Sequence, residues 1–307
     1  MNRYKIIETD PGTDVDDALA ILYGLRSPDV EIVSLNMVYG NVDLRAKITK
    51  KILELDNKNI PVYVGESTPI RTVKPIFHFG REGEGLLTKD EIEKKESPNI
   101  SSIDFLVEEI NKNPGKYDLI SIGAMTNIAK AFLLDKTLET KINHLYIMGG
   151  SISYPKRFDI ENYRGPNKVE HNVACDVEAA DILIRSKCPK TLLTYDITSR
   201  ANIQLEDLSK LKELGEPEES IFNMIEIWNQ YLRQKGNPNM DYCSMHDPLT
   251  LMVSIKPDLI KTKKVPIYVD NEGYTRIGGN DYLNLAVDLD YPKFKEDFLN
   301  TILSKRV

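Results

Sequence analysis

Short apolar runs rich in Ile, Val, Leu and Tyr recur along the chain, and amphipathic stretches with helical spacing separate them. This alternation is typical of repeated strand-helix units that build a mostly parallel sheet. The predicted strands are 4–9, 31–39, 60–65, 117–122, 144–149, 190–196, 264–269 and 283–289. The predicted helices are 16–26, 43–55, 102–112, 127–135, 177–186, 205–214, 219–235, 247–254 and 292–304. We therefore expect an α/β fold with an open, mostly parallel twisted sheet and helices on both faces.

Three long segments interrupt the alternation: 66–100, 151–170 and 236–246. Loops of this length inside a compact domain are more often lids or substrate contacts than simple connectors. The chain of 307 residues shows no internal repeat, and its length lies near the upper limit for one hydrophobic core. We expect a single domain over 1–307 with insertions at these three segments.

Polar or glycine residues follow several predicted strands directly. They are Asp10, Asn41, Thr126, Asn127, Gly149 and Gly150. Ligands of open parallel sheets bind outside the carboxyl ends of the strands. We therefore expect these positions to converge on one crevice.

Composition narrows the classes of partner. The 40 basic and 47 acidic residues give a net charge of -7 without any Lys/Arg run, so neither nucleic acid nor a membrane surface is an expected partner. No apolar run has the length of a signal-peptide core or a membrane span. The three cysteines show no CxxC spacing, which argues against a disulfide framework or a zinc site and favours a cytoplasmic protein.

The stretch ETDPGTDVDDALA at 8–20 carries four aspartates within eight positions: Asp10, Asp14, Asp16 and Asp17. Capping of the predicted helix explains the last two but not the whole group, because unpaired carboxylates at close range repel one another. A bound divalent cation would offset this repulsion. Oxygen ligands without a Cys or His set favour Ca²⁺ or Mg²⁺ over zinc.

Two known acidic loops do not match this stretch. An EF-hand loop starting at Asp10 needs Gly at its sixth position and Glu at its twelfth, where this chain has Val15 and Ile21. The acidic loop of a haloacid-dehalogenase-type phosphatase needs a nucleophilic Asp at the position of Glu8, and Pro11 falls in its turn.

Motifs along the whole chain resemble the nucleoside hydrolase family, the inosine-uridine-preferring type of N-ribohydrolase. The opening stretch resembles the family's DxDPGxDD element, with Glu8 for the first Asp and two additional residues in the loop. Further matches are YGNV at 39–42, HFGREGEGL at 78–86, GAMTNIA at 123–129, MGG at 148–150, VEHNVACDVEAA at 169–180, YDIT at 195–198 in place of LDVT, and HDPL at 246–249.

The resemblance implies a Ca²⁺ site and a metal-activated water. Its carboxylate ligands would be Asp10, Asp17 and Asp247, and Thr126 would contribute its backbone carbonyl. Asp10 would also accept the proton of the water. In this alignment Asp16 binds ribose and Asp14 is an inserted residue, but a register with Asp14 as a ligand stays open.

The resemblance also implies a grip on the ribose hydroxyls by Glu170 and Asn172, together with Asp16 and Asn41. The i, i+2 spacing of Glu170 and Asn172 places both on one face if the segment is extended. A further ribose-binding asparagine is expected at Asn162, with Asn167 as the alternative.

At the base, the resemblance makes His246 the residue that protonates or hydrogen-bonds the leaving group, since an unperturbed histidine titrates near neutral pH. His78 is a weaker second candidate. The predicted helix 219–235 offers Tyr231, or alternatively Trp228, although aromatic residues at helical spacing are more often core.

The function implied is hydrolysis of the N-glycosidic bond of ribonucleosides to ribose and a free base. HD at 246–247, in place of WD, argues against strict purine specificity and leaves an inosine/uridine range and a pyrimidine preference open. The resemblance also implies a homodimer or homotetramer. Two alternatives remain: a nucleoside- or ribose-binding protein without turnover, and a hydrolase of another ribosyl compound such as a modified nucleoside or nicotinamide riboside.

Overall fold

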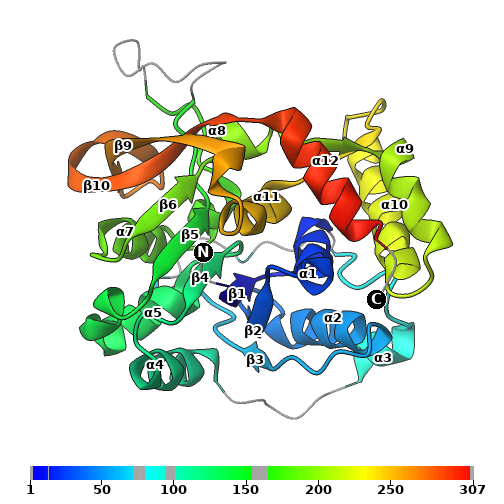
Figure 1. The fold of residues 1–307 in the computed structure, drawn as a ribbon, viewed down its shortest axis with the longest axis horizontal. Helices are drawn as coiled ribbons and strands as arrows, with labels where there is room; N and C mark the ends of the chain where they lie inside the picture. Colours follow the sequence, from blue (N-terminus) through cyan, green and yellow to red (C-terminus); the bar gives the residue numbers. More distant parts are fainter. Residues whose placement is uncertain are drawn as a thin grey trace.

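The computed structural model describes residues 3–12, 14–71, 76, 80–94, 101–153 and 165–304 (Figure 1). Within these residues the main sheet has the strand order β3-β2-β1-β4-β5-β6-β10-β9. Its strands are β1 (Tyr4–Thr9), β2 (Glu31–Met37), β3 (Val62–Val64), β4 (Asp118–Ser121), β5 (His144–Met148), β6 (Lys190–Leu193), β9 (Ile260–Val269) and β10 (Thr275–Leu289). A two-stranded sheet pairs β7 (Asn202–Gln204) with β8 (Tyr242–Ser244).

Neighbouring strands from β3 to β10 run parallel, and β9 alone runs antiparallel, along β10. The predicted open, mostly parallel sheet is therefore confirmed. The chain builds outward from β1 to β2 and β3, then crosses to the other side of β1 to add β4, β5 and β6. The carboxyl ends of β1 and β4 consequently flank the topological switch point, where open α/β sheets form their ligand crevice.

Helices cover both faces of this sheet (Figure 1). Successive residues of a strand point to opposite faces, so Ile7 and Ile6 of β1 belong to different cores. The core around Ile7 is completed by α1 (Asp16–Arg26), α2 (Val42–Leu55), α10 (Glu218–Gln234), α11 (His246–Val253) and α12 (Tyr291–Ile302). The core around Ile6 is completed by α4 (Ser102–Lys112), α5 (Thr126–Leu134) and α7 (Val177–Arg185). None of the described helices has the length and apolarity that crossing a membrane requires.

Several short elements depart from the expected pattern. They are α3 (Lys89–Glu93), α6 (His171–Cys175), α8 (Tyr195–Thr198), α9 (Leu205–Leu208) and the 3₁₀ segments η1 (Lys136–Thr140), η2 (Ser209–Glu213) and η3 (Pro257–Leu259). The predicted strand 190–196 ends at Leu193, because the chain turns into α8. The expectation of an extended segment around His171 is wrong, since this residue begins α6 and Glu170 is its N-cap.

Candidate active site

A cavity of about 460 Å³ opens at the carboxyl ends of the central strands. Asp10 follows β1, Ile122 follows β4, Met148 ends β5 and Tyr195 comes shortly after β6, and all four residues line it. The cavity therefore lies at the topological switch point. Of the six positions expected to converge there, Asp10 lines the cavity, whereas Asn41, Thr126, Asn127, Gly149 and Gly150 are not among its lining residues.

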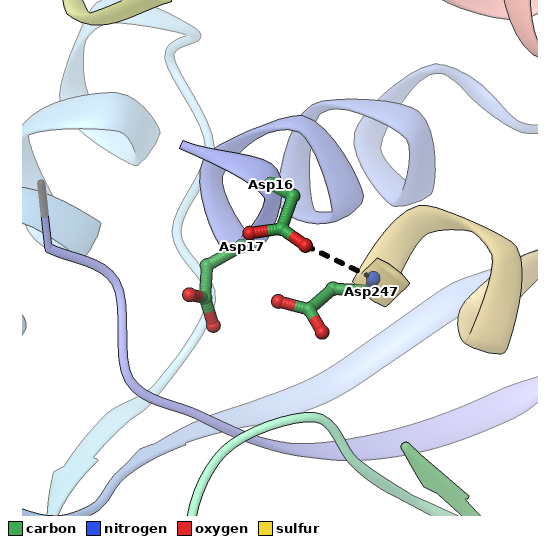
Figure 2. Close-up of side chains that lie close together, drawn as sticks. All are labelled: Asp16, Asp17 and Asp247. Carbon is green, nitrogen blue, oxygen red and sulfur yellow. Dashed lines mark hydrogen bonds between the residues drawn. The ribbon is translucent and has the colours of Figure 1, made fainter. Parts of the chain in front are cut away.

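A cluster of buried carboxylates forms one wall of the cavity (Figure 2). Asp16 and Asp17 stand in the first turn of α1, and Asp247 stands in the first turn of α11. Each offers a carboxylate oxygen, and these oxygens lie within 4.8 Å of one another. The backbone N–H of Asp247 donates a hydrogen bond of 3.3 Å to Oδ2 of Asp16. Residues 231 positions apart thus meet because two helix N-termini adjoin.

Asp10 joins this cluster through the backbone. Its N–H donates to Oδ1 of Asp17 at 3.0 Å, and the Thr9 hydroxyl donates to the same oxygen. The turn after β4 approaches Asp10 closely, since a Cβ atom at Gly123 would lie 2.5 Å from Oδ1 of Asp10. The absence of a side chain at Gly123 therefore lets the GAMTNIA segment pack against this carboxylate.

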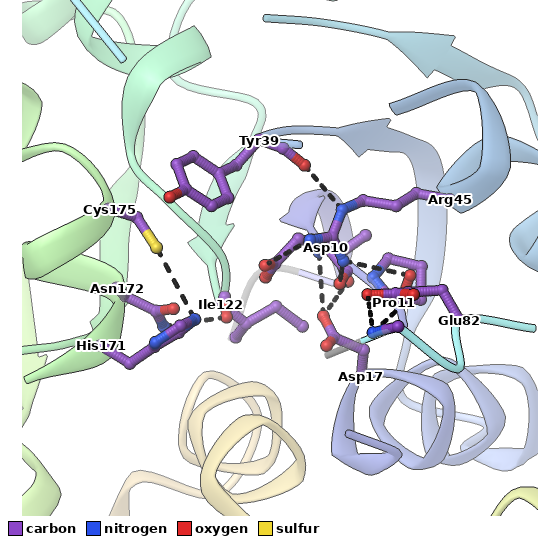
Figure 3. A network of polar contacts seen from close by, with 12 residues as sticks. Asp10, Pro11, Asp17, Tyr39, Arg45, Glu82, Ile122, His171, Asn172 and Cys175 are labelled. Carbon is purple, nitrogen blue, oxygen red and sulfur yellow. Dashed lines mark hydrogen bonds and ion pairs between the residues drawn. The ribbon is translucent and has the colours of Figure 1, made fainter. Parts of the chain in front are cut away.

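Arg45 is a cavity residue that the sequence analysis missed. Its guanidinium reaches from α2 to the turn after β1, donates to the backbone carbonyls of Asp10, Pro11 and Tyr39, and lies 3.4 Å from Oδ2 of Asp10 (Figure 3). These contacts join the ends of β1 and β2. No local signal marks Arg45, because it stands within an ordinary amphipathic helix and its role depends on where that helix packs.

Burial is the largest influence on the cluster's acidity, and repulsion between neighbouring carboxylates adds to it. Together they raise the pKa of Asp17 to about 7. Burial raises the pKa of Asp10 to about 6, although the charge of Arg45 opposes the shift. The same causes hold the pKa values of Asp16 and Asp247 well above the ordinary value of an aspartate. A cation at this wall would relieve both the burial cost and the repulsion, and the all-oxygen donors suit a hard divalent ion.

Glu170 and Asn172 also line the cavity, and Figure 3 shows Asn172 on the side away from Arg45. The Glu170 carboxylate accepts backbone hydrogen bonds from Asn172 at 3.0 Å, Val173 at 3.2 Å and Gly150 at 2.9 Å. The amide of Asn172 donates to the carbonyls of Ile122 and Met148 at 3.1 and 3.3 Å. The cap of α6 therefore holds two polar side chains rigidly against the ends of β4 and β5.

His246, Tyr195 and Lys168 form an aromatic and basic part of the lining. The rings of Tyr195 and His246 stack with centroids 5.6 Å apart, and Nδ1 of His246 lies 2.8 Å from the Thr198 hydroxyl. Burial, and secondarily the charge of Lys168, lowers the pKa of His246 to about 4. The imidazole is therefore neutral at pH 7. Tyr195 and Lys168 are cavity residues that are not among the site residues predicted from the sequence.

Other predicted site residues lie elsewhere. Asn41 caps α2 by accepting a hydrogen bond from Leu44 N–H at 3.1 Å and does not line the cavity. Thr126 begins α5, and its hydroxyl donates to Asp176 at 2.7 Å, so its side chain does not line the cavity either. Tyr231 stacks on Trp228 with ring centroids 5.4 Å apart, outside the residues that line the cavity.

Two predicted residues, His78 and Asn162, lie outside the described part of the chain. The alternative to Asn162, Asn167, is exposed and accepts a hydrogen bond of 2.7 Å from Ser153, away from the cavity lining. Asp14, the alternative to Asp16, does line the cavity and accepts a hydrogen bond of 2.9 Å from Val15 N–H.

Comparisons with known proteins agree with this arrangement. The family model described as inosine-uridine preferring nucleoside hydrolase matches residues 5–296. Uridine nucleosidase 1 of Arabidopsis thaliana is 28% identical over 87% of this chain and 78% of its own length. The inosine-uridine preferring nucleoside hydrolase of Crithidia fasciculata is 26% identical over 96% of this chain and 95% of its own. The solved purine-preferring ribonucleoside hydrolase from Gardnerella vaginalis superposes with a TM-score of 0.83, at 26% identity over 98% of both chains.

Proposed function

The chain belongs to the inosine-uridine preferring nucleoside hydrolase family, and from this premise we propose that it hydrolyses the N-glycosidic bond of ribonucleosides with the help of Ca²⁺. The observation that carries the proposal is the group of Asp10, Asp16, Asp17 and Asp247 in one cavity at the switch point of the sheet. Within the described residues, Asp10 alone of these four pairs with a basic side chain, that of Arg45.

Asp10, Asp17 and Asp247 are the proposed carboxylate ligands, with the backbone carbonyl of Thr126. Asp16 lies within the same group of oxygens and is a further candidate ligand. The buried, oxygen-only donor set supports a hard ion, and the six to eight oxygens that Ca²⁺ accepts leave room for water and ribose hydroxyls. When bound, Ca²⁺ would polarise a water molecule and make it a better nucleophile at neutral pH.

In the proposed reaction Asp10 accepts a proton from the attacking water as the water oxygen bonds to C1′ of the ribose. The C1′–N bond breaks, and its electron pair leaves with the base. Glu170, Asn172 and Asp16 bind the ribose hydroxyls. Because Glu170 and Asn172 are already fixed by backbone hydrogen bonds, they can favour the flattened, cationic ribosyl group without rearranging.

His246 is proposed to hydrogen-bond the departing base. If the Thr198 hydroxyl donates to Nδ1, the ring proton resides on Nε2 and is available to the base. The neutral state of the imidazole favours such a hydrogen bond over full proton transfer. Tyr231, His78, Asn162 and Asn41 stay predicted substrate contacts.

The proposed substrate range is either inosine and uridine together or mainly pyrimidine nucleosides. The printed names of the relatives include both a uridine nucleosidase and an inosine-uridine preferring hydrolase, while the Gardnerella vaginalis protein is purine-preferring. Both proposed ranges contain uridine, which is therefore the first substrate to test. A dimer or tetramer is proposed from the resemblance, and a cytoplasmic location from the cysteine pattern. Light scattering after size-exclusion chromatography tests the assembly.

The deciding experiment measures base release from uridine, inosine, cytidine, adenosine and guanosine by the wild type and by Asp10→Ala. Each assay is run with calcium and after treatment with a chelator. We expect uridine to be cleaved only by the calcium-loaded wild type. If no base were released from any of the nucleosides, the proposed hydrolase activity would be refuted. Full activity after verified metal removal would refute only the proposed role of calcium.

A further inference from the structure

We propose that Lys168, positioned over the ring of Tyr195, determines leaving-group specificity by stabilising negative charge on the departing base. This inference rests on the proposed ribonucleoside hydrolysis and assigns to that reaction a residue beyond His246. Two observations support it: the arrangement of the Tyr195 and His246 rings in the cavity, and the different contacts that Arg45 and Lys168 make.

Tyr195 contributes an aromatic ring to the lining of the cavity. It is 37% exposed although it stands directly behind the buried strand β6, and its ring stacks on that of His246 at an interplanar angle of 27°. Nζ of Lys168 lies 2.9 Å from the centroid of the Tyr195 ring. An ammonium group over an aromatic face is attracted by the ring's electrons, which holds the flexible lysine at the cavity wall.

The Arg and Lys side chains of the cavity, Arg45 and Lys168, have different contacts. The guanidinium of Arg45 is buried and occupied by Asp10 and three backbone carbonyls. Lys168, by contrast, has no carboxylate within ion-pairing distance among the residues that the structure describes. Its contact with Tyr195 leaves hydrogen-bond donors of the ammonium available, since Lys carries three. Lys168 is thus the cavity cation that a ligand can recruit.

The chemistry of the lining places the base, and not the ribose, beside this cation. Ribose hydroxyls are best bound by the carboxylates and the amide of the lining, those of Asp16, Glu170 and Asn172. A flat heterocycle suits the rings of Tyr195 and His246. When the C1′–N bond breaks, its electron pair moves onto the base nitrogen and spreads to the carbonyl oxygen of a base such as uracil or hypoxanthine. The ammonium of Lys168 stabilises that charge, and the base subsequently takes a proton from water.

The test compares two leaving groups in Lys168→Met and Lys168→Arg. Uracil needs stabilisation of its negative charge, whereas p-nitrophenolate is already a stable anion. Loss of one charge-assisted hydrogen bond should lower kcat/KM for uridine by about 10- to 100-fold in Lys168→Met. The p-nitrophenyl riboside should lose less than about threefold, and Lys168→Arg should recover most of the uridine activity because it keeps the charge.

Lys116→Met is the matched control. Lys116 also lies over aromatic rings, those of Tyr4 at 4.9 Å and Tyr117 at 5.1 Å, but it precedes β4 and so stands at the amino ends of the strands, away from the cavity. The Lys116→Met substitution should leave kcat/KM unchanged for both uridine and the p-nitrophenyl riboside. Thermal unfolding of all three variants checks that the fold is kept.

Three results would overturn the inference. Equal losses for uridine and the p-nitrophenyl riboside in Lys168→Met would show a merely structural role, and unchanged uridine hydrolysis would show no role. A loss of binding confined to uridine 5′-monophosphate would show that Lys168 meets a 5′-phosphate instead of the base. Failure of the proposed function looks different, because the wild type itself would then release no uracil, and the inference would fall with it.

Discussion

The two ends of helix α1 both bury charged side chains, and they balance those charges in opposite ways. At the carboxyl end, Arg26 lies between Asp56 and Glu218. Its Nη2 is 2.7 Å from Oδ1 of Asp56, its Nε is 2.9 Å from Oε1 of Glu218, and all three side chains are at most 5% exposed. Each buried charge there has its partner within the chain.

At the amino end, Asp16 and Asp17 face Asp247 across the cavity wall. Among the described residues, no basic side chain lies within ion-pairing distance of these three carboxylates, and Arg45 pairs with Asp10 instead. The available compensation comes from hydroxyl and backbone N–H donors and from the positive ends of α1 and α11.

This difference separates a structural ion cluster from a ligand site. Buried charges are tolerated when they are paired, so the cluster of Arg26, Asp56 and Glu218 needs no ligand to offset its charges. Buried carboxylates that repel one another are stabilised by a proton or by a positive charge from outside the chain, and the proposed cation would supply that charge. Burial alone is the same at both ends, so the charge balance is what identifies the site.

Removal of one carboxylate from the unbalanced end gives the largest expected effect. Asp247→Asn should lower kcat/KM for uridine by roughly 10³-fold or more, because metal-assisted charge stabilisation contributes several kcal/mol. The metal-free variant should unfold at the same temperature as the metal-free wild type or higher, since repulsion is relieved. Steady-state kinetics and calorimetry with a chelator measure the two effects. A variant that keeps wild-type kinetics would remove Asp247 from the site.

Disruption of the balanced end should instead affect stability. Arg26→Met leaves Asp56 and Glu218 buried without their cation, so the free energy of unfolding should fall by about 3–4 kcal/mol. Kinetics at low temperature, where the variant stays folded, should match the wild type per folded molecule. Urea denaturation measures the loss. A decrease below about 1 kcal/mol would mean that water readily reaches Asp56 and Glu218.

Calcium should distinguish the two ends directly. A free calcium concentration 100-fold above Kd should raise the free energy of unfolding of the wild type by about 2.7 kcal/mol. Arg26→Met should gain the same amount, because its metal site is intact, and Asp247→Asn should gain far less. Thermal unfolding with a calcium titration gives all three values. An equal gain in Asp247→Asn would place the calcium elsewhere.

The sequence was sufficient for the frame of the fold. The predicted ranges 4–9, 16–26 and 102–112 coincide with β1, α1 and α4, because apolar periodicity and polar ends mark these elements locally. The segment after Glu170 is the helix α6, although the sequence favours an extended segment there. Glutamate is not a favoured N-cap residue, so nothing local announced the start of α6.

The residues of the candidate site fall into two groups in the same way: local sequence motifs mark some of them, and contacts between distant elements place the others. Asp10, Asp16 and Asp17 were visible as an acidic stretch, and HDPL drew attention to Asp247. Arg45 and Lys168 were not visible, because each acquires its place through contacts between distant elements, Arg45 through the packing of α2 beside the turn after β1 and Lys168 through the approach of its loop to Tyr195. The roles assigned to all of these residues stay predictions.

The dependence of stability on pH gives the most direct comparison of the two ends. Asp10 and Asp17 have pKa values of about 6 and 7 in the fold, raised from 3.8. The metal-free folded protein therefore binds more protons than the unfolded chain between about pH 4 and 7. Stability contributed by these protons is fully present below pH 4 and is lost as the pH rises through 6 and 7, so the metal-free protein should become less stable over this interval.

The proposed calcium should reverse that trend, because metal ions bind carboxylates in their deprotonated form. The difference in urea midpoint between the calcium-loaded and metal-free wild type should therefore widen from pH 5 to pH 8. Each unit of pKa shift corresponds to about 1.4 kcal/mol of free energy. Arg26→Met should show the same widening at lower overall stability, since the unbalanced end is unchanged in it. If the difference between the two urea midpoints stayed constant from pH 5 to pH 8, the carboxylates at the amino end of α1 would already be neutralised within the metal-free protein. The contrast between the two ends of the helix would then disappear.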